Sequence, residues 1–183
     1  MPVAARCTFT VTASSLLTVA DAHQSTRAEA GCQQGVSYVR TGTIEQPILA
    51  KKGDAISIDW GYLYLPAING EVSIKDDAAQ PLLCYTHDFG RTGSAASYMM
   101  VGYDEVQDIE YMFHRYKAYW THEGTVSIFQ LFRRMNSQYA SIMQRCRDFD
   151  RRIYDDADSS AAQRPSAAVD HRPSSGPFQR HAL

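Results

Sequence analysis

The chain has 183 residues, 44% of them hydrophobic, with 20 acidic and 18 basic side chains and a formal net charge of −2. This length suits one domain of ordinary size or two small ones. A charge so close to zero excludes the basic field of a non-specific nucleic-acid-binding protein. No apolar stretch reaches the ~18–20 residues that cross a bilayer, so neither a nucleic-acid partner nor a membrane partner is expected.

The N-terminal stretch and the cysteines give no sign of export or of metal binding. Residues 1–20 lack the apolar block of a secretory signal peptide. The four cysteines include no C-x-x-C pair, and their wide spacing is not typical of zinc sites: Cys7, Cys32, Cys84 and Cys146. We expect buried free thiols, no metal site and no cofactor.

Up to about Tyr98, apolar and polar side chains alternate, as in strands with one buried face. The alternation predicts strands at residues 7–11, 36–39, 56–64, 72–74, 82–85 and 98–101. Pro66 is expected to end the third strand, and Asn69-Gly70 to form a tight hairpin turn into the fourth. Short strands in this number predict an antiparallel sandwich.

From about Tyr103 the apolar spacing becomes helical. A first helix is predicted from Val106, Ile109, Met112, Phe113 and Tyr116. A long helix follows Gly124, because eight apolar residues step alternately by four and three: Ile128, Phe132, Met135, Tyr139, Ile142, Cys146, Phe149 and Ile153. Its start carries a possible capping box of Ser127 and Gln130, with Thr125 as the alternative cap.

The stripe on this long helix is more typical of one-sided packing in a helical domain than of a dimeric coiled coil. With few partner helices in a chain of this length, part of the stripe would stay exposed. Self-association through residues 125–156, or poor solubility, is therefore expected.

Two carboxylates lie where the strand pattern gives way to the helical one. Asp104 and Glu105 are interpreted either as the cap of a helix, whose free N–H groups and dipole favour acids, or as acids of a functional site. They are the candidate catalytic residues.

Further candidates for binding lie in the strand region. Asp59 occupies the predicted strand at 56–64, on the face opposite Trp60, and is either a solvated charge or half of a hydrogen-bonded site. His87 and Asp88 follow the predicted strand at 82–85, in a polar segment expected to be a loop.

Several strings of the sequence agree in order and spacing with one known family. They occupy residues 43–54, 58–65, 103–112, 119–120, 145–150 and 154–157, from Thr43-Ile44-Glu45-Gln46-Pro47 to Tyr154-Asp155-Asp156-Ala157. Together they resemble the glutaminase A family of bacteria and fungi. The resemblance runs from about Ser14 to Ala157.

This resemblance implies an α+β fold. Residues 1–102 would be the end of an antiparallel β-sandwich region, and residues 103–157 the first helices of an α/α toroid of the six-hairpin glycosidase type. Family members are several times longer than this chain, so most of the toroid would be missing. The family hydrolyses the side-chain amide of glutamine to glutamate and ammonia, so a small-molecule amide substrate is implied, with little or no activity for this chain alone.

After Ala157 both the helical period and the resemblance stop. Residues 158–183 are rich in Ser, Ala and Pro and carry too little apolar surface to offset chain entropy, so they are expected to be disordered. We hypothesise that they are a foreign, out-of-frame ending of a truncated gene product. The family is usually secreted or periplasmic, but localisation stays open because no export signal is seen.

Two other functions remain as alternatives. In a β-sandwich binding module, exposed Trp60, Tyr62 and Tyr64 would stack on a sugar. Because Ile56 and Ile58 share their face of the strand, however, burial of these aromatic rings is the stronger expectation. A carbohydrate-active hydrolase is the second alternative, since the toroid fold hosts many glycosidases.

Overall fold

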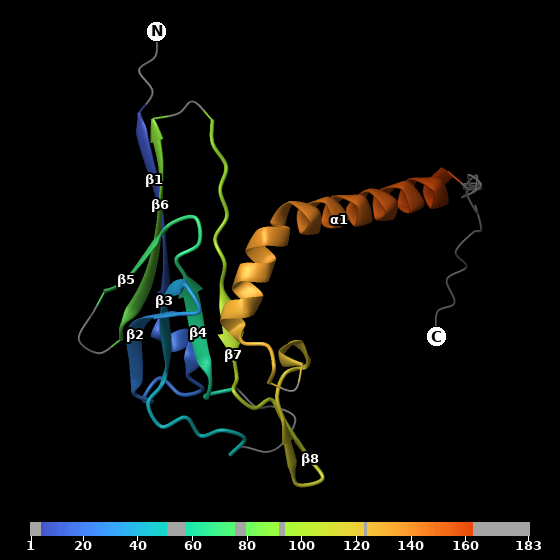
Figure 1. The fold of residues 1–183 in the computed structure, drawn as a ribbon. Coiled ribbons are helices and arrows are strands. Elements are labelled where there is room, and N and C mark those ends of the chain that lie inside the picture. The colour runs from blue at the N-terminus through green and yellow to red at the C-terminus, as the bar shows by residue number, and fades with distance from the viewer. Residues whose placement is uncertain (1–4, 51–57, 76–79, 92–93, 123, 163–183) are drawn as a thin grey trace, which may run out of the picture. The chain divides into compact units, whose positions relative to one another are not determined.

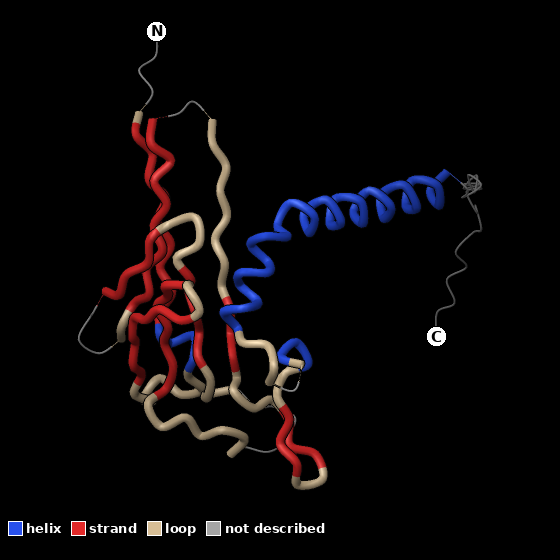
Figure 2. Tube along the Cα trace, viewed as in Figure 1, coloured by secondary structure: helices blue, strands red, loops and turns tan. Residues whose placement is uncertain are grey.

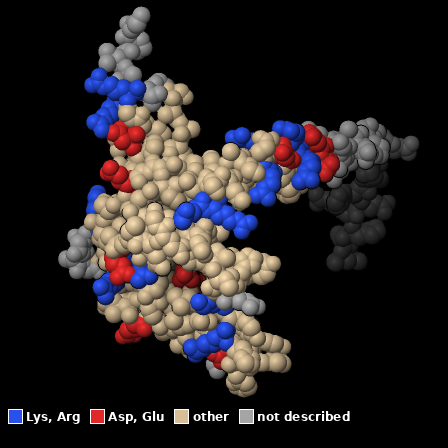
Figure 3. Space-filling model, viewed as in Figure 1, with Lys and Arg blue, Asp and Glu red and all other residues tan. Residues whose placement is uncertain are grey.

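The computed structural model describes residues 5–50, 58–75, 80–91, 94–122 and 124–162, with side chains as far as residue 157. These residues form nine strands, two short 3-10 helices and one long helix (Figures 1 and 2). The chain separates into two compact units, Met1–Tyr139 and Ala140–Leu183, with the boundary inside the long helix. On the face shown in Figure 3, acidic and basic side chains lie interspersed.

The first sheet has three antiparallel strands in the order β1 (Arg6–Ser14), β6 (Leu82–Arg91), β5 (Glu71–Lys75). The strands predicted at 7–11, 72–74 and 82–85 are thereby confirmed. The loop expected at residues 87–91 is wrong, because β6 continues through it and pairs with β1 as far as Arg6 and Arg91.

The second sheet has four antiparallel strands in the order β2 (Thr26–Gln33), β3 (Val36–Thr43), β4 (Tyr62–Pro66), β7 (Gly102–Asp104). The strand at 36–39 is confirmed and is longer than predicted. β2 was not predicted. Gln34 and Gly35 join it to β3 with φ angles of 51° and 77°, the left-handed pair that a two-residue hairpin turn requires.

Three predictions about strand bounds and turns are wrong. The strand at 56–64 begins only at Tyr62, because Gly61 at φ 88° breaks the extended chain; Ile56 lies outside the described residues. Asn69-Gly70 does not close a hairpin, since β4 and β5 belong to different sheets. Residues 98–101 precede a strand instead of forming one.

The two sheets pack face to face around an apolar core. Val39 and Leu65 of the four-stranded sheet meet Leu83 and Tyr85 of the three-stranded sheet, all at most 1% exposed. Packed antiparallel sheets followed by a long helix make the fold α+β, as the sequence predicted.

The first helix predicted after Tyr103 is wrong. Its residues form a hairpin of β8 (Ile109–Tyr111) and β9 (His114–Tyr116). Met112 and Phe113 make the two-residue turn at φ 47° and 65°. The two 3-10 turns are η1 (Ser15–Thr18) and η2 (Tyr119–Thr121). Whether residues 103–157 begin a helical catalytic domain stays a prediction.

The long helix is confirmed as α1 (Ile128–Ala162). Its predicted capping box is present: the Ser127 N–H donates to Gln130 Oε1 at 2.9 Å, and the Gln130 N–H donates to Ser127 Oγ at 3.2 Å. Ile128, Phe129 and Phe132 are buried with Tyr64 of β4 in a second core. The first turns of α1 therefore cover the outer face of the four-stranded sheet.

Two further expectations are corrected in part. The helix does not stop at residue 157 but continues through Ala162, whereas the predicted disorder of 163–183 lies outside the described residues. All four cysteines are free thiols, but only Cys84 is buried; Cys7, Cys32 and Cys146 are exposed.

Candidate functional site

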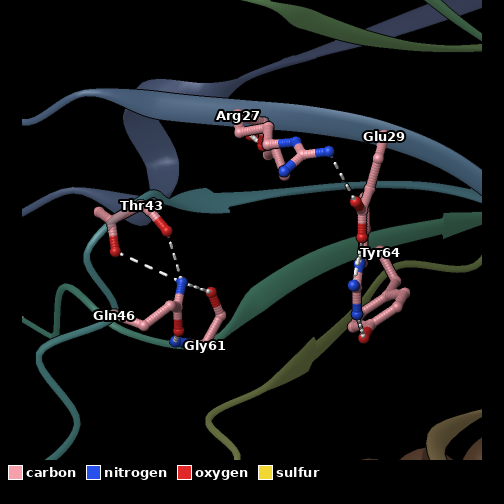
Figure 4. A network of polar contacts seen from close by, with 8 residues as sticks. Arg27, Glu29, Thr43, Gln46, Gly61 and Tyr64 are labelled. Atoms are coloured by element: carbon pink, nitrogen blue, oxygen red, sulfur yellow. Dashed lines mark hydrogen bonds and ion pairs between the residues drawn. The ribbon is translucent and has the colours of Figure 1, made fainter.

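A polar ladder crosses the outer face of the four-stranded sheet. Glu29 of β2 lies opposite Arg40 of β3, which lies opposite Tyr64 of β4. The Arg40 guanidinium pairs with Glu29, donates to the Tyr64 hydroxyl at 2.9 Å and stacks 4.2 Å from the Tyr62 ring centroid. Arg27 lies 3.9 Å from Glu29 on the other side (Figure 4). These contacts fix the Tyr64 hydroxyl at the end of the ladder.

Asp104 lies on this same face, because it pairs with Tyr62 in the register of β4 and β7. It lines a cavity of about 270 Å³ between the sheet, the segment at 117–126 and the start of α1. Burial raises the pKa of Tyr64, and the charge of Asp104 raises it further, against the opposing effect of Arg40. The carboxylate and the phenol line the same cavity.

The other walls of the cavity combine a cation with apolar surface. Its lining includes Lys117, Trp120, Phe129, Gln33 and Ser127. Gly124, at φ 87°, leaves room for the lysine, since a Cβ at that position would lie 3.1 Å from Lys117 Nζ. Apolar walls with a few convergent polar groups are typical of small-molecule sites.

Glu105, the second predicted acid, does not line this cavity. It follows Asp104 in the chain and interacts with Asp108, three residues further along the loop. Burial, a hydrogen bond with Asp108 and the charges of Asp108 and Asp104 raise the pKa of Glu105 to about 7. A carboxyl that titrates near neutral pH can take up or release a proton, as a general acid or base does.

The loop between Glu105 and Asp108 is strained. Val106 has φ 67°, which is rare for a β-branched residue, and the Gln107 N–H donates to the Glu105 carbonyl at 2.6 Å across it. Asp104 Oδ1 accepts the Val106 N–H at 3.0 Å and holds the turn. Backbone strain of this kind costs roughly 1–3 kcal/mol and occurs most often at functional sites. The helix cap proposed for Asp104 and Glu105 is wrong, since no helix starts there.

Asp59 belongs to a buried structural network. It is 1% exposed and accepts a hydrogen bond from Gln24 Nε2 at 2.7 Å, while its carbonyl accepts from Thr43 Oγ1 at 2.6 Å. Gln46 reinforces the same corner by accepting the Gly61 N–H at 2.7 Å and donating to the Thr43 carbonyl at 2.8 Å (Figure 4). Asp59 is therefore hydrogen-bonded and not a solvated charge.

Trp60 is a core residue and not a sugar platform. It is 4% exposed, as is Tyr64, and its indole N–H donates to the Gln107 carbonyl at 3.0 Å. The Tyr103 hydroxyl donates to the Trp60 carbonyl at 2.6 Å, and burial, with the charges of Glu105 and Asp59, raises the pKa of Tyr103 to about 12. The exposed aromatic platform considered from the sequence is therefore excluded.

His87 and Asp88 lie apart from Asp104, on the three-stranded sheet. They line a separate groove of about 470 Å³ with Arg6, Glu71 and Thr86 among its walls. Arg6 forms an ion pair with Asp88, and this contact holds the pKa of Asp88 below its usual range. An exposed ion pair of this kind contributes little to stability.

The structure thus distributes the predicted residues over three places instead of one site. Only Asp104 lines the cavity that combines both charges with apolar walls. Lys117 and Arg40 were missed from the sequence, because they come from separate segments and share no motif, and Tyr64 was considered only as part of a sugar-stacking platform.

Comparison with known proteins adds one finding. Residues 69–156 match DUF5127, a domain of unknown function. The matched segment runs from the connection before β5 into α1 and contains Asp104, Lys117 and Trp120. No curated protein and no solved structure matches the chain.

The described ranges contain neither a metal-binding cluster nor a membrane-spanning helix. No three His, Cys, Asp or Glu side chains there gather closely enough to hold a metal ion. No described helix has the length and apolar character to span a bilayer.

Replacing Glu105 with glutamine is expected to change how stability depends on pH. The folded carboxyl keeps its proton up to about pH 7, whereas the unfolded one loses it near pH 4.5. The protonated Glu105 carboxyl therefore contributes fully to the free energy of unfolding below pH 4.5, and this contribution is lost as the pH rises through 7. Because Glu105 is partly exposed, the effect is on the order of 1 kcal/mol.

Urea unfolding at pH 4.5 and pH 8 measures this difference. At pH 8, Glu105→Gln should be more stable than the wild type, with little difference at pH 4.5. Glu45→Gln, at an exposed acid, is the matched control. Equal behaviour of the two variants would contradict the raised pKa.

Proposed function

We propose that this chain is part of a glutaminase A-like amidohydrolase, which converts glutamine to glutamate and ammonia. One observation supports this most: strings that resemble that family, at 103–112 and 119–120, supply Asp104, Val106 and Trp120 to the cavity. Both strings also fall within the 69–156 segment.

The cavity is chemically suited to a free amino acid. Such a substrate carries an ammonium group, which Asp104 would accept, and a carboxylate, which Lys117 would bind. Hydrogen bonds between charged partners are shorter and about twice as strong as neutral ones. Trp120 and Phe129 offer apolar surface to the methylene groups of glutamine.

The same residues do not make a complete catalytic site. Amide hydrolysis needs an activated water, an acid for the leaving nitrogen and donors for the oxyanion. Among the described residues that line the cavity, Asp104 is the one carboxylate, while Glu105 lies outside it. We therefore propose that this chain binds the substrate weakly and does not hydrolyse it.

Asp104→Asn is expected to lower the affinity for L-glutamine at least about tenfold, or about 1.4 kcal/mol, by removing the charge that accepts the ammonium. Tryptophan fluorescence measures the binding, because Trp120 lines the cavity whereas Trp60 is buried elsewhere. Trp120→Phe should remove the fluorescence change and so assign it to Trp120. Glu105→Gln is the matched control, with an unchanged affinity for L-glutamine. Binding of cellobiose but not of glutamine would contradict the proposal and favour the carbohydrate-active alternative.

Incubation of the purified chain with L-glutamine is expected to release no ammonia above a blank, since Asp104 is the one acid among the described residues that line the cavity. An enzyme-coupled ammonia assay measures this directly. Sustained ammonia release that disappears in Asp104→Asn would refute the proposed inactivity, although it would support the amidohydrolase class.

A further inference from the structure

The part of α1 that belongs to the second unit carries an apolar stripe without a partner among the described residues of that unit. Ile142, Cys146, Phe149 and Ile153 step by four, three and four residues, and Phe149 and Ile153 are 55% and 52% exposed. A repeat of this kind averages 3.5 residues, which keeps one seam of a helix facing a second helix. In heptad terms Cys146 and Ile153 take position a, and Ile142 and Phe149 take position d.

A groove of about 270 Å³ lies along this seam. Its walls are Ile142, Arg145, Cys146, Phe149 and Asp150. The first four occupy successive d, g, a and d positions, the set that forms the hole for an a-position side chain of a facing helix. The groove therefore has the composition of one half of a knobs-into-holes contact.

The charges beside the seam favour one orientation of the two helices. Arg145 is at position g and Asp150 at position e, and neither forms an ion pair within the described part of the chain. In a parallel pair, a g residue meets the e residue five positions further along its partner, which joins Arg145 to Asp150. In an antiparallel pair, g would meet g, so that Arg145 and Arg152 would face like charges.

We propose that residues 142–153 form a parallel, in-register coiled coil with a second copy of this chain. Cys146 then lies beside Cys146 of the other copy, since a positions face each other across a parallel pair. The contact is short, so the dimer is weak and forms at micromolar or higher protein concentration. It is independent of the function of the Asp104 cavity.

Disulfide trapping tests this geometry in the full chain. In Cys7→Ser/Cys32→Ser, Cys146 is the remaining exposed thiol, since Cys84 is buried. With copper phenanthroline, two S–H bonds break and one S–S bond forms, while two electrons pass to copper and two protons to water. Non-reducing gels are expected to show a covalent dimer. Adding Cys146→Ser and Arg147→Cys moves the thiol off the seam and should slow linkage at least tenfold.

Sedimentation of the reduced protein supplies the second readout. Arg145→Glu should weaken the dimer, Arg145→Asp combined with Asp150→Arg should restore it, and Arg147→Glu is the matched control outside the seam. Ile142→Asp should abolish the dimer, whereas Gln144→Asp should leave it intact. Two results would overturn the proposal. One is a reduced protein that stays monomeric at about 100 µM, and the other is disulfide formation from position 147 as fast as from position 146.

Discussion

Replacing Gly61 with alanine is expected to destabilise the protein by about 2–5 kcal/mol. Gly61 has φ 88°, which costs an L-residue energy in itself. In addition, the new Cβ would lie 2.5 Å from the Asp104 carbonyl oxygen and 2.8 Å from Glu105 Cα. Backbone atoms cannot move aside without separating β4 from β7.

Gly35→Ala is the matched control for this prediction. Gly35 has φ 77°, but nothing lies within 4 Å of a Cβ at that position. It should therefore cost only the conformational term, about 1–2 kcal/mol. Urea unfolding of both variants separates the cost of the positive φ from the cost of the steric clash. Equal losses of unfolding free energy would show that β7 does not lie against Gly61.

Phe132→Ala is expected to cost about 3–5 kcal/mol, because it removes a buried ring from the contact between α1 and the sheet. Phe132 is 3% exposed, and a Cβ on Gly102 of β7 would lie 2.6 Å from its Cζ. The ring therefore fills the space that the glycine leaves. Its loss should also enlarge the neighbouring Asp104 cavity, since Ile128 and Phe129 are held by the same core.

Phe149→Ala on the same helix stripe is the control. Phe149 is 55% exposed, so at dilute protein its loss should change stability by about 0.5 kcal/mol or less. Thermal unfolding at low micromolar concentration compares the two variants. A small effect of Phe132→Ala would contradict the packing of α1 on the four-stranded sheet.

The strongest sequence predictions were those supported by two independent signals. The long helix had both a sustained stripe and the Ser127–Gln130 capping box, and both are present. A helix was predicted in place of the β8–β9 hairpin because four apolar residues fit helical spacing as well as two strands: Ile109, Met112, Phe113 and Tyr116. Its turn is made by Met112-Phe113, without the Asn or Gly that normally marks such a turn.

The strands were recognised by alternation and missed where alternation was weak. β2 is built from small and charged residues such as Ala28, Glu29 and Gly31, which give no apolar pattern. In contrast, residues 56–64 alternate well but stop being extended at Gly61, whose left-handed conformation depends on the close approach of β7. Tertiary contact, and not local preference, decided that boundary.

The candidate site was only half accessible from the sequence. Asp104 and Glu105 stood out as a pair, but β7 ends at Asp104, so Asp104 stays on the face of the sheet while Glu105 begins the loop that leads to Asp108. Lys117 joins Asp104 through the path of the chain after β9, which no spacing rule describes. The resemblance indicated a chemistry, but only the structure shows that one acid, one cation and apolar walls line the same cavity.

If the Asp104 cavity binds a free amino acid, as we propose, the residues that line it should respond to L-glutamine. Amide NMR spectra of the ¹⁵N-labelled chain, recorded during titration with L-glutamine, test it most directly. We predict saturable shifts at Asp104, Lys117 and the Trp120 indole, which vanish in Asp104→Asn, with the signals around His87 and Asp88 unmoved. Shifts centred on the His87 groove would contradict the proposal, as would the absence of shifts at roughly tens of millimolar glutamine.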